Sequence, residues 1–479
     1  MDRADTDTVF CYRTRSKVEK GLLLDLIEKV NGYSRIQIKR LGRAKKLRIQ
    51  STERRTRSQA GLIPVVKFLQ DREVFDALDT SIAYKRWNND QYQLSDVMYL
   101  TILGVIAGAT SLLKVVAVWS YGVLRTIAGW PWIPDATTFG RIFKEVSVEQ
   151  ISLMETLQHR LRSGIWRDAL RAGTSKVGAL RQMWIDVDST VDTVFGHQEG
   201  AAKGYNPHKR GALSYHPIMA FCCETKDILQ AWLRSGNAYT SNGIVEFMKQ
   251  LPAHLPNRTR VVFRSDSGFF VGSLLELLES RKHGYLVKVK LKNFKELMGK
   301  QVWTPIPNQS GWEQCQFEHE CSGWKKPRRF VAVRVEKEQA PSKQQELFDN
   351  KHYDYFCYVT TQALSPWDAH KKYGERATCE TWVEESKSQM GIGHIRTSKF
   401  VANAALFQCA VLAYNVIRWM ALMSGNAKLR QSEITTIHIF LIRVAGKLVT
   451  GSRRLTPKTL ADLLYQKEWA AWVAVGLPP

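Results

Sequence analysis

The chain has 479 residues, and its 69 Lys and Arg outnumber its 45 Asp and Glu, which gives a formal net charge of +24. Hydrophobic residues make up 44% of the chain, which excludes a wholly disordered protein, and 8 cysteines are too few for a disulfide-stapled scaffold. The basic balance favours a polyanionic partner, nucleic acid before any other. The N-terminus lacks the apolar segment of a secretory signal, so we expect a cytoplasmic protein.

The first segment of the chain is strongly basic. Residues 31–60 carry ten Lys and Arg against a single acid, Glu53. Apolar side chains such as Ile36, Leu41 and Leu47 are interleaved with the charges, which favours a DNA-contacting element over a solvated charge run. We therefore predict a basic DNA-binding arm over residues 1–60.

Residues 61–175 are predicted to form a helical N-terminal domain, because apolar side chains recur at intervals of three and four. The most apolar stretch of this segment, 97–119, is interrupted by Lys114 and by several glycines and threonines. A membrane span needs about 20 continuous apolar residues. The pattern therefore favours a buried pair of helices, and we expect no association with a membrane.

Residues 176–295 are predicted to form the first part of an α/β core. The expected elements, in chain order, are strands over 181–190, 216–223 and 227–235, a helix over 241–251, a strand over 260–266, a helix over 274–281 and a strand over 285–290. Strands in series, followed by strands that alternate with helices, imply a mixed sheet flanked by helices.

Three more segments complete the predicted organisation. Residues 296–370 are expected to form a β-rich insertion, with strands over 329–336 and 353–360. Residues 371–425 are expected to form the second part of the core, in which the patterns over 370–390 and 400–423 are helical. Residues 426–479 carry eight Lys and Arg against three acids and are expected to form a basic helical C-terminal region.

Carboxylates mark the ends of two predicted strands. Asp186 and Asp188 are two residues apart in one strand, so their side chains share one face of the sheet. Asp266 ends the strand over 260–266, where the chain turns. Acids at strand ends of an α/β sheet lie where ligands bind, although such acids also serve simply to form turns.

A third group of charges lies on the predicted helix over 370–390. Tyr373, Arg376, Glu380 and Lys387 are spaced at offsets of 0, 3, 7 and 14. At about 100° per residue, these side chains fall within roughly 60° on one face of a helix. The stripe is either part of a binding site or a solvated ladder of ion pairs.

The segment YGERATCETWVEESK (373–387) resembles the YREK signature of the cut-and-paste DDE transposases of bacterial insertion sequences, the IS-four superfamily to which the Tn-five transposase belongs. DST (188–190), RSDSGF (264–269) and RTSKFVANAALFQCAVLAYN (396–415) resemble further segments of that family, in the same order. The resemblance covers about 180–420. It implies an RNase H-like catalytic core that carries a β-rich insertion.

The resemblance also implies a catalytic triad of Asp188, Asp266 and Glu380, which would bind two Mg²⁺ ions, with Mn²⁺ as a possible substitute. Hard oxygen ligands suit both ions. Asp186 remains a rival for the first acid because it shares the strand face of Asp188, and Asp192 is a weaker rival.

Tyr373, Arg376 and Lys387 would bind a DNA phosphate in such an enzyme. Lys203, Lys209 and Arg210, together with His208, are candidates for contacts with the DNA backbone, although the same residues would serve surface solubility. A flipped base near the cut would need an aromatic surface, for which the candidates are Trp303, Trp312 and Trp324, although the pattern favours a buried core position for any one of them.

The predicted function is cut-and-paste DNA transposition by a nucleoid-associated bacterial protein. Its partners would be double-stranded DNA, as inverted repeats and as target, and a second copy of the chain in a paired-end complex. Two alternatives remain. One is an RNase H-like metal-dependent nuclease that does not join strands, and the other is a non-catalytic DNA-binding protein derived from a transposase.

Overall fold

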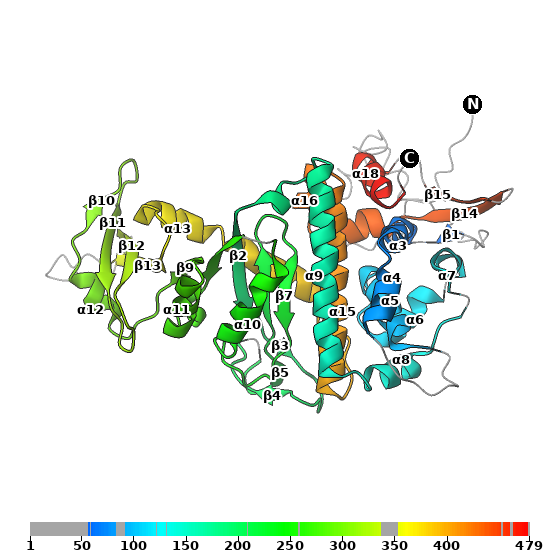
Figure 1. Ribbon diagram of the computed structural model, residues 1–479, viewed down its shortest axis with the longest axis horizontal. Coiled ribbons are helices and arrows are strands. Elements are labelled where there is room, and N and C mark those ends of the chain that lie inside the picture. The colour runs from blue at the N-terminus through cyan, green and yellow to red at the C-terminus, as the bar shows by residue number, and fades with distance from the viewer. Residues whose placement is uncertain are drawn as a thin grey trace, which may run out of the picture. The chain divides into compact units, whose positions relative to one another are not determined.

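The computed structural model describes residues 56–57, 59–82, 92–120, 122–130, 132–207, 209–256, 259–336, 353–451, 454–459 and 463–477 (Figure 1). The chain divides into two compact units, one of residues 1–58 and 445–466 and the other of residues 59–444 and 467–479. The predicted basic arm over 1–60 lies almost entirely outside the described residues.

The smaller unit contains an antiparallel sheet in the order β1-β14-β15. Its strands are β1 (Thr56–Arg57), β14 (Gly446–Gly451) and β15 (Arg454–Thr459). The C-terminal region was predicted to be helical, and this part of the prediction is wrong for β14 and β15. Short runs rich in Thr and Val favour strands, but they were too brief to give a clear alternation.

Seven helices are described in the predicted helical segment. They are α3 (Leu62–Asp71), α4 (Val74–Ser81), α5 (Leu94–Ile106), α6 (Leu112–Trp119), α7 (Gly122–Ala128), α8 (Ala136–Phe143) and α9 (Val148–Arg171). Helix α9 begins with a capping box, in which the Ser147 hydroxyl accepts from the Gln150 amide and the Gln150 side chain accepts from the Ser147 amide. The prediction of a buried helix pair over 97–119 is confirmed for α5, in which only Asp96 is not buried, whereas α6 is buried on one face and leaves Leu113 71% exposed.

The large sheet of the second unit has nine strands in the order β10-β11-β12-β13-β9-β8-β2-β6-β7. Its core strands are β2 (Gln182–Ser189), β6 (Ile218–Cys222), β7 (Ile228–Trp232), β8 (Arg260–Ser265) and β9 (Gly284–Lys288). Strand β6 is antiparallel to both β2 and β7, whereas β8 and β9 run parallel to β2. An antiparallel meander followed by two parallel strands is the arrangement of an RNase H-like core, so the predicted mixed sheet is confirmed.

The predicted β-rich insertion extends this sheet at the β9 edge. Strands β10 (Thr304–Pro305), β11 (Trp312–His319), β12 (Arg328–Glu336) and β13 (Tyr353–Thr360) are antiparallel neighbours, and β13 pairs with β9. The strands predicted over 329–336 and 353–360 are thus confirmed nearly residue for residue. We call these four strands the extension.

The helices that follow the core strands fall into two groups along the chain. Helices α10 (Ile244–Gln250), α11 (Gly272–Ser280) and α12 (Phe294–Gly299) follow β7, β8 and β9 in the chain. A second group comprises α13 (Pro366–Gly374), α14 (Ala377–Glu384), α15 (Phe400–Met423), α16 (Ala427–Gln431), α17 (Ile434–Ile437) and α18 (Gln466–Gly476). Between β2 and β6, a small sheet of β3 (Asp192–Thr193), β5 (Leu213–Tyr215) and β4 (Ala202–Lys203) is inserted.

Helix α15 closes the other edge of the core sheet and lies beside α9 (Figure 1). The Asn415 side chain accepts from the Ile228 amide and donates to the Ile228 carbonyl, and Gln408 donates to the Ala231 carbonyl. These bonds satisfy backbone groups of the edge strand β7 that would otherwise be unpaired. Among the described helices, only α15 is long and apolar enough to cross a membrane, and 83% of its most apolar window is buried inside the protein.

An ion-pair cluster joins α11 to the extension. Arg328 Nε lies 2.7 Å from Glu279 Oε1, Lys326 Nζ lies 2.9 Å from Glu279 Oε2, and the Tyr285 hydroxyl donates to Glu279 at 2.6 Å. Burial opposes ionisation of Glu279, but these bonds outweigh it and lower the pKa of Glu279 to about 2. Ionised Glu279 therefore stabilises the fold above the pKa of an unfolded glutamate, and this stabilisation disappears as pH falls from about 4.5 towards 2.

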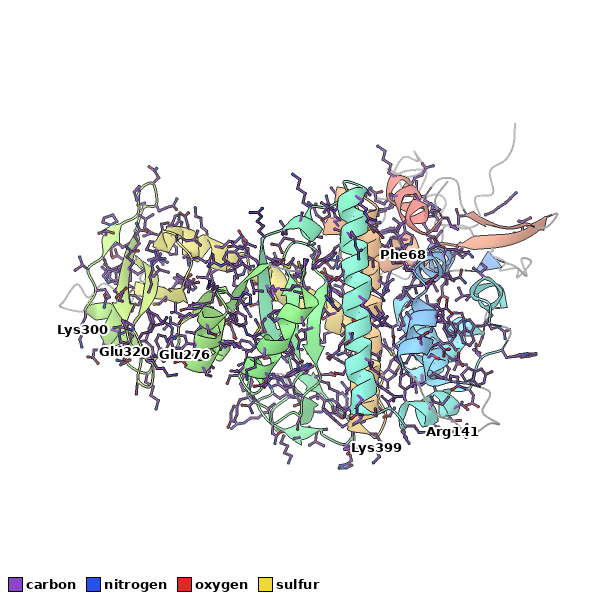
Figure 2. The ribbon with its side chains drawn as sticks, in the orientation of Figure 1. Phe68, Arg141, Glu276, Lys300, Glu320 and Lys399 are labelled. Carbon is purple, nitrogen blue, oxygen red and sulfur yellow. The ribbon has the colours of Figure 1, made fainter. Side chains whose placement is uncertain are left out.

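Glu279→Gln is expected to lower the free energy of unfolding by about 2 kcal/mol near neutral pH, since hydrogen bonds from charged donors are lost. Urea denaturation at several pH values would measure this, and the gap from the wild type should narrow as pH falls below 4.5. Glu276→Gln on the same helix (Figure 2) is the matched control, because among the described residues Glu276 pairs with Lys325, whose side chain is 82% exposed. An equal loss in both variants would contradict the assignment.

Candidate active site

The site is built on the ends of two neighbouring strands. Strands β2 and β8 run parallel, with Val187 opposite Ser265, so Asp188 and Asp266 reach the same edge of the sheet one residue later. The Ser189 amide donates to Asp188 Oδ1 at 2.8 Å. Asp266 caps the turn Ser267–Phe269, in which the Gly268 amide donates to Asp266 Oδ1 at 3.0 Å. One oxygen of each carboxylate is thereby oriented by a backbone amide.

The third acid comes from an interrupted helix. Helix α13 ends at Gly374, a turn follows at 375–376, and α14 carries Glu380. Arg376, in the turn, is only 5% exposed, and its guanidinium joins two of the predicted acids. Arg376 Nη2 lies 2.9 Å from Asp188 Oδ2, and Arg376 Nη1 lies 3.2 Å from Glu380 Oε1. The structure thus gathers Asp188 and Glu380 around one buried cation.

The charges of this site influence one another. Burial raises the pKa of Asp188 to about 6, and the negative charges of Asp266 and Glu380 add to this rise against the opposing effect of Arg376. Burial also raises the pKa of Tyr373 to about 12, with smaller contributions from the same three acids. All three predicted acids therefore lie within electrostatic reach of one another.

The straight helical stripe predicted from Tyr373 to Lys387 is wrong in its geometry. After α14 the chain forms a π-helical turn, Glu385–Gln389, which adds a residue to the turn and rotates the side chains that follow. Lys387 Nζ donates to the Val191 carbonyl at 2.7 Å, beside the loop that follows Asp188. Tyr373 packs on Tyr358, with ring centroids 4.6 Å apart.

The two rival acids have other partners. Asp186 is fully buried, and Arg264 binds both of its oxygens, with Nε 2.6 Å from Oδ1 and Nη2 2.8 Å from Oδ2. Asp192 Oδ1 lies 2.5 Å from Arg396 Nη2. Burial raises the pKa of Asp192, although Arg396 opposes the rise. The charge of Asp186 is thus matched inside the sheet, away from solvent.

The remaining predicted DNA contacts lie on the surface around the small sheet. Lys203 belongs to β4, and Lys209 and Arg210 are exposed in the loop between β4 and β5. Lys209 Nζ lies 5.0 Å from the centre of the Phe195 ring. His208 lies outside the described residues.

The three tryptophans are half-buried in the extension and pack on other side chains. Trp303 contacts Tyr355 and the Arg334 guanidinium, Trp312 stacks on Phe356, and Trp324 contacts Phe270 and Arg328. Their rings therefore contribute to the packing of the extension.

Comparison with known proteins decides the family. Residues 39–474 match the family described as transposase DDE domain group 1. The chain belongs to this transposase family. Transposases with a DDE domain act with divalent metal ions, so an acidic site is expected in this one. No curated protein matches the chain.

Several solved transposases are similar to this transposase at low identity. A cryo-EM structure of a piggyBac transposase synaptic complex with hairpin DNA is 10% identical, covers 80% of each chain and gives a TM-score of 0.42. A Mos1 transposase paired-end complex with the left transposon end is 10% identical over 57% of this chain and 78% of that chain, with a TM-score of 0.17. A Mos1 mariner paired-end complex with Mn is 10% identical over 60% of this chain and 85% of that chain, with a TM-score of 0.16.

The chemistry of the transposase site fits a hard divalent cation. Its donors are carboxylate oxygens, which Mg²⁺ and Mn²⁺ prefer, and the amide bonds to Asp188 and Asp266 leave their other oxygens for further ligands. Within the described part of the chain, no three acidic, His or Cys side chains are close enough to hold one ion together. Arg376 occupies Asp188 Oδ2, so cation binding requires this side chain to move.

The sequence did not reveal the residues that support the acids. His216 Nε2 lies 3.1 Å from the Ser189 hydroxyl, next to Asp188, and His216 Nδ1 donates to the Ala238 carbonyl at 2.6 Å. Burial lowers the pKa of His216, which favours the neutral ring that these two bonds require. A histidine at the start of a predicted strand gave no signal of this role.

Proposed function

We propose that this transposase binds the terminal inverted repeats of a bacterial insertion sequence of the IS-four type, cuts the element out of donor DNA and joins it to target DNA. The observation that carries the proposal is the pairing of Asp188 and Glu380 with the buried Arg376, on the strand end that neighbours Asp266. A transposase fold alone would be kept by a non-catalytic descendant. The presence of the acids together with their supporting hydrogen bonds supports a catalytic protein over a non-catalytic one.

The proposed catalytic residues have separate tasks. Asp188, Asp266 and Glu380 would hold two Mg²⁺ ions, for which Mn²⁺ is the expected substitute. When bound, such ions lower the pKa of an attacking water or DNA 3′-hydroxyl and neutralise the leaving oxygen during displacement at phosphorus. The chain itself fixes two of its carboxylates by backbone amides, so these two side chains would need little reorientation when cations bind.

Arg376 has a second proposed task in this scheme. In the structure its guanidinium neutralises Asp188 and Glu380. A planar fork of this kind also fits two phosphate oxygens, so Arg376 would turn from the acids to the DNA phosphate when cations replace it. Tyr373 and Lys387 are the further proposed phosphate contacts of the YREK signature.

The DNA would lie across the basic surface around the small sheet. Lys203, Lys209 and Arg210 are proposed to contact its backbone, and the net charge of +24 favours the association. Two ends of an element must be paired, so we propose a homodimer as the acting species, in the bacterial cytoplasm and associated with the nucleoid.

Strand transfer tests the proposal directly. Purified full-length protein would be incubated with precut oligonucleotides that carry the inverted repeat flanking this gene, a supercoiled target plasmid and Mg²⁺. We expect end-joined products, and none when EDTA removes the metal. Cleavage of uncut ends without joining would identify a nuclease, and binding without either reaction would identify a non-catalytic DNA-binding protein.

A further inference from the structure

One aromatic side chain beside the acids is left almost entirely in solvent. Tyr239 is 78% exposed, in the loop between β7 and α10. Within the described part of the chain its ring stacks on no other ring, and no Lys or Arg side chain lies over it. A ring that is this exposed adds little buried apolar area to the fold, and its faces are open to a ligand.

The loop that carries Tyr239 is firmly anchored. The Arg234 guanidinium donates to the carbonyls of Tyr239, Thr240 and Asn242 at 3.4, 3.1 and 2.7 Å, and its Nε donates to the His216 carbonyl at 2.8 Å. Three hydrogen bonds from one guanidinium thus hold the loop backbone at Tyr239 and in the residues that follow it. The loop backbone is therefore fixed while the Tyr239 ring is exposed. A fixed backbone lowers the entropy cost of binding a partner.

The same loop contacts residues next to both strand-end acids, Asp188 and Asp266. Ala238, on one side of Tyr239, is joined through His216 to Ser189, the neighbour of Asp188. On the other side, Thr240 packs on Gly268, where an added Cβ would lie 2.8 Å from Thr240 Cγ2. The Gly268 amide is the one that donates to Asp266. Tyr239 therefore lies at the rim of the site, between the supports of the two acids.

The charge of this rim favours nucleic acid over protein or lipid. The segment 235–243 carries no charged residue, and at Gly236 its backbone packs directly against Gly204, the residue after Lys203. The adjoining loop supplies Lys209 and Arg210 as exposed cations. A neutral aromatic ring that stands beside cations matches a nucleobase attached to a phosphate backbone.

We propose that Tyr239 stacks on the base of a nucleotide that flanks the scissile phosphate. This inference rests on the proposed function, and it assigns the stacking surface to the β7–α10 loop rather than to the tryptophans of the extension. Base–aromatic stacking tolerates any sequence, because every base has a π face. Tyr239 would thus hold the DNA next to the acids without reading the sequence of the end.

A double-mutant cycle, in which one change is made in the protein and the other in the DNA, tests the stacking through the binding affinity. Wild type, Tyr239→Ala and Tyr239→Phe would be compared on precut ends that are intact or carry an abasic site at each flanking nucleotide in turn. With intact DNA, Tyr239→Ala is expected to weaken binding by about 10- to 100-fold, whereas Tyr239→Phe, which keeps the ring, should match the wild type. At one abasic position the wild type should bind the DNA only as tightly as Tyr239→Ala binds intact DNA. Tyr239→Ala itself should bind that abasic DNA and intact DNA equally well.

Tyr205→Ala is the matched control, because Tyr205 is 77% exposed on the neighbouring loop. Tyr205→Ala should show the same difference in affinity between intact and abasic DNA as the wild type. Unchanged binding by Tyr239→Ala, additive losses at every abasic position, or a Tyr239→Phe variant as weak as Tyr239→Ala would overturn the inference. Failure of the wild type to join ends would instead refute the proposed function, so the two failures are distinguishable.

Discussion

Asp188→Asn is expected to reduce DNA cleavage and strand transfer by about a thousandfold or more, because stabilisation of the reacting phosphate by bound cations amounts to several kcal/mol. Asn keeps the size of the side chain and can still accept from the Ser189 amide, so the strand end should keep its shape. It loses the negative charge that binds a cation. Glu380→Gln should have a comparable effect, since its carboxylate is the exposed member of the same cluster.

The measurement is single-turnover joining of precut ends, with thermal unfolding of each variant as the test of folding. Burial and the neighbouring acids raise the pKa of Asp188, and Arg376 keeps its pair with Glu380, so removing the charge of Asp188 should cost less stability than removing that of Asp186. Glu375→Gln is the matched control, because Glu375 lies in the turn beside Arg376 but is 56% exposed and pairs with Lys372. Full activity in Asp188→Asn, or equal loss in Glu375→Gln, would disprove the assigned triad.

The elements of the core could be predicted from sequence because their patterns are local. Strands β2, β8, β12 and β13 are continuous runs of buried or alternating residues, and α15 has the bounds that its apolar pattern predicts. The order of such elements was enough to predict a mixed sheet. It did not predict that the insertion would lengthen the core sheet, because strand pairing between β13 and β9 joins residues far apart in the chain.

The finer geometry of the site depends on tertiary contacts that no local pattern contains. Helical periodicity placed Tyr373, Arg376 and Lys387 on one straight face, whereas a turn at 375–376 and a π-helical turn interrupt the helix. The buried Arg418 pairs with Glu385 at the start of that π-helical turn, so part of its support lies on α15. Tyr239 was missed for a different reason, since the polar loop around it gives no periodic signal.

The choice between Asp186 and Asp188 was the main ambiguity of the sequence, since both side chains share one strand face. Asp186→Asn should separate them through stability. It leaves the Arg264 guanidinium, which is 1% exposed, without the carboxylate that binds it at 2.6 and 2.8 Å. Breaking a buried pair by removing one partner costs about 3 to 5 kcal/mol, because the remaining charge stays buried. We therefore expect a large fall in the urea midpoint of Asp186→Asn.

The structure also predicts how this defect should be relieved. Arg264 donates to the Lys372 carbonyl of α13, so the ion pair ties the helix before Arg376 to β8. Asp186→Leu combined with Arg264→Met removes both charges, and such replacements of a buried ion pair by apolar residues are often neutral in stability. The double variant should recover most of the lost stability, measured by the same urea transition. If Asp186→Asn instead kept wild-type stability and lost strand transfer, Asp186 would be the catalytic acid and the buried pair would have no structural role.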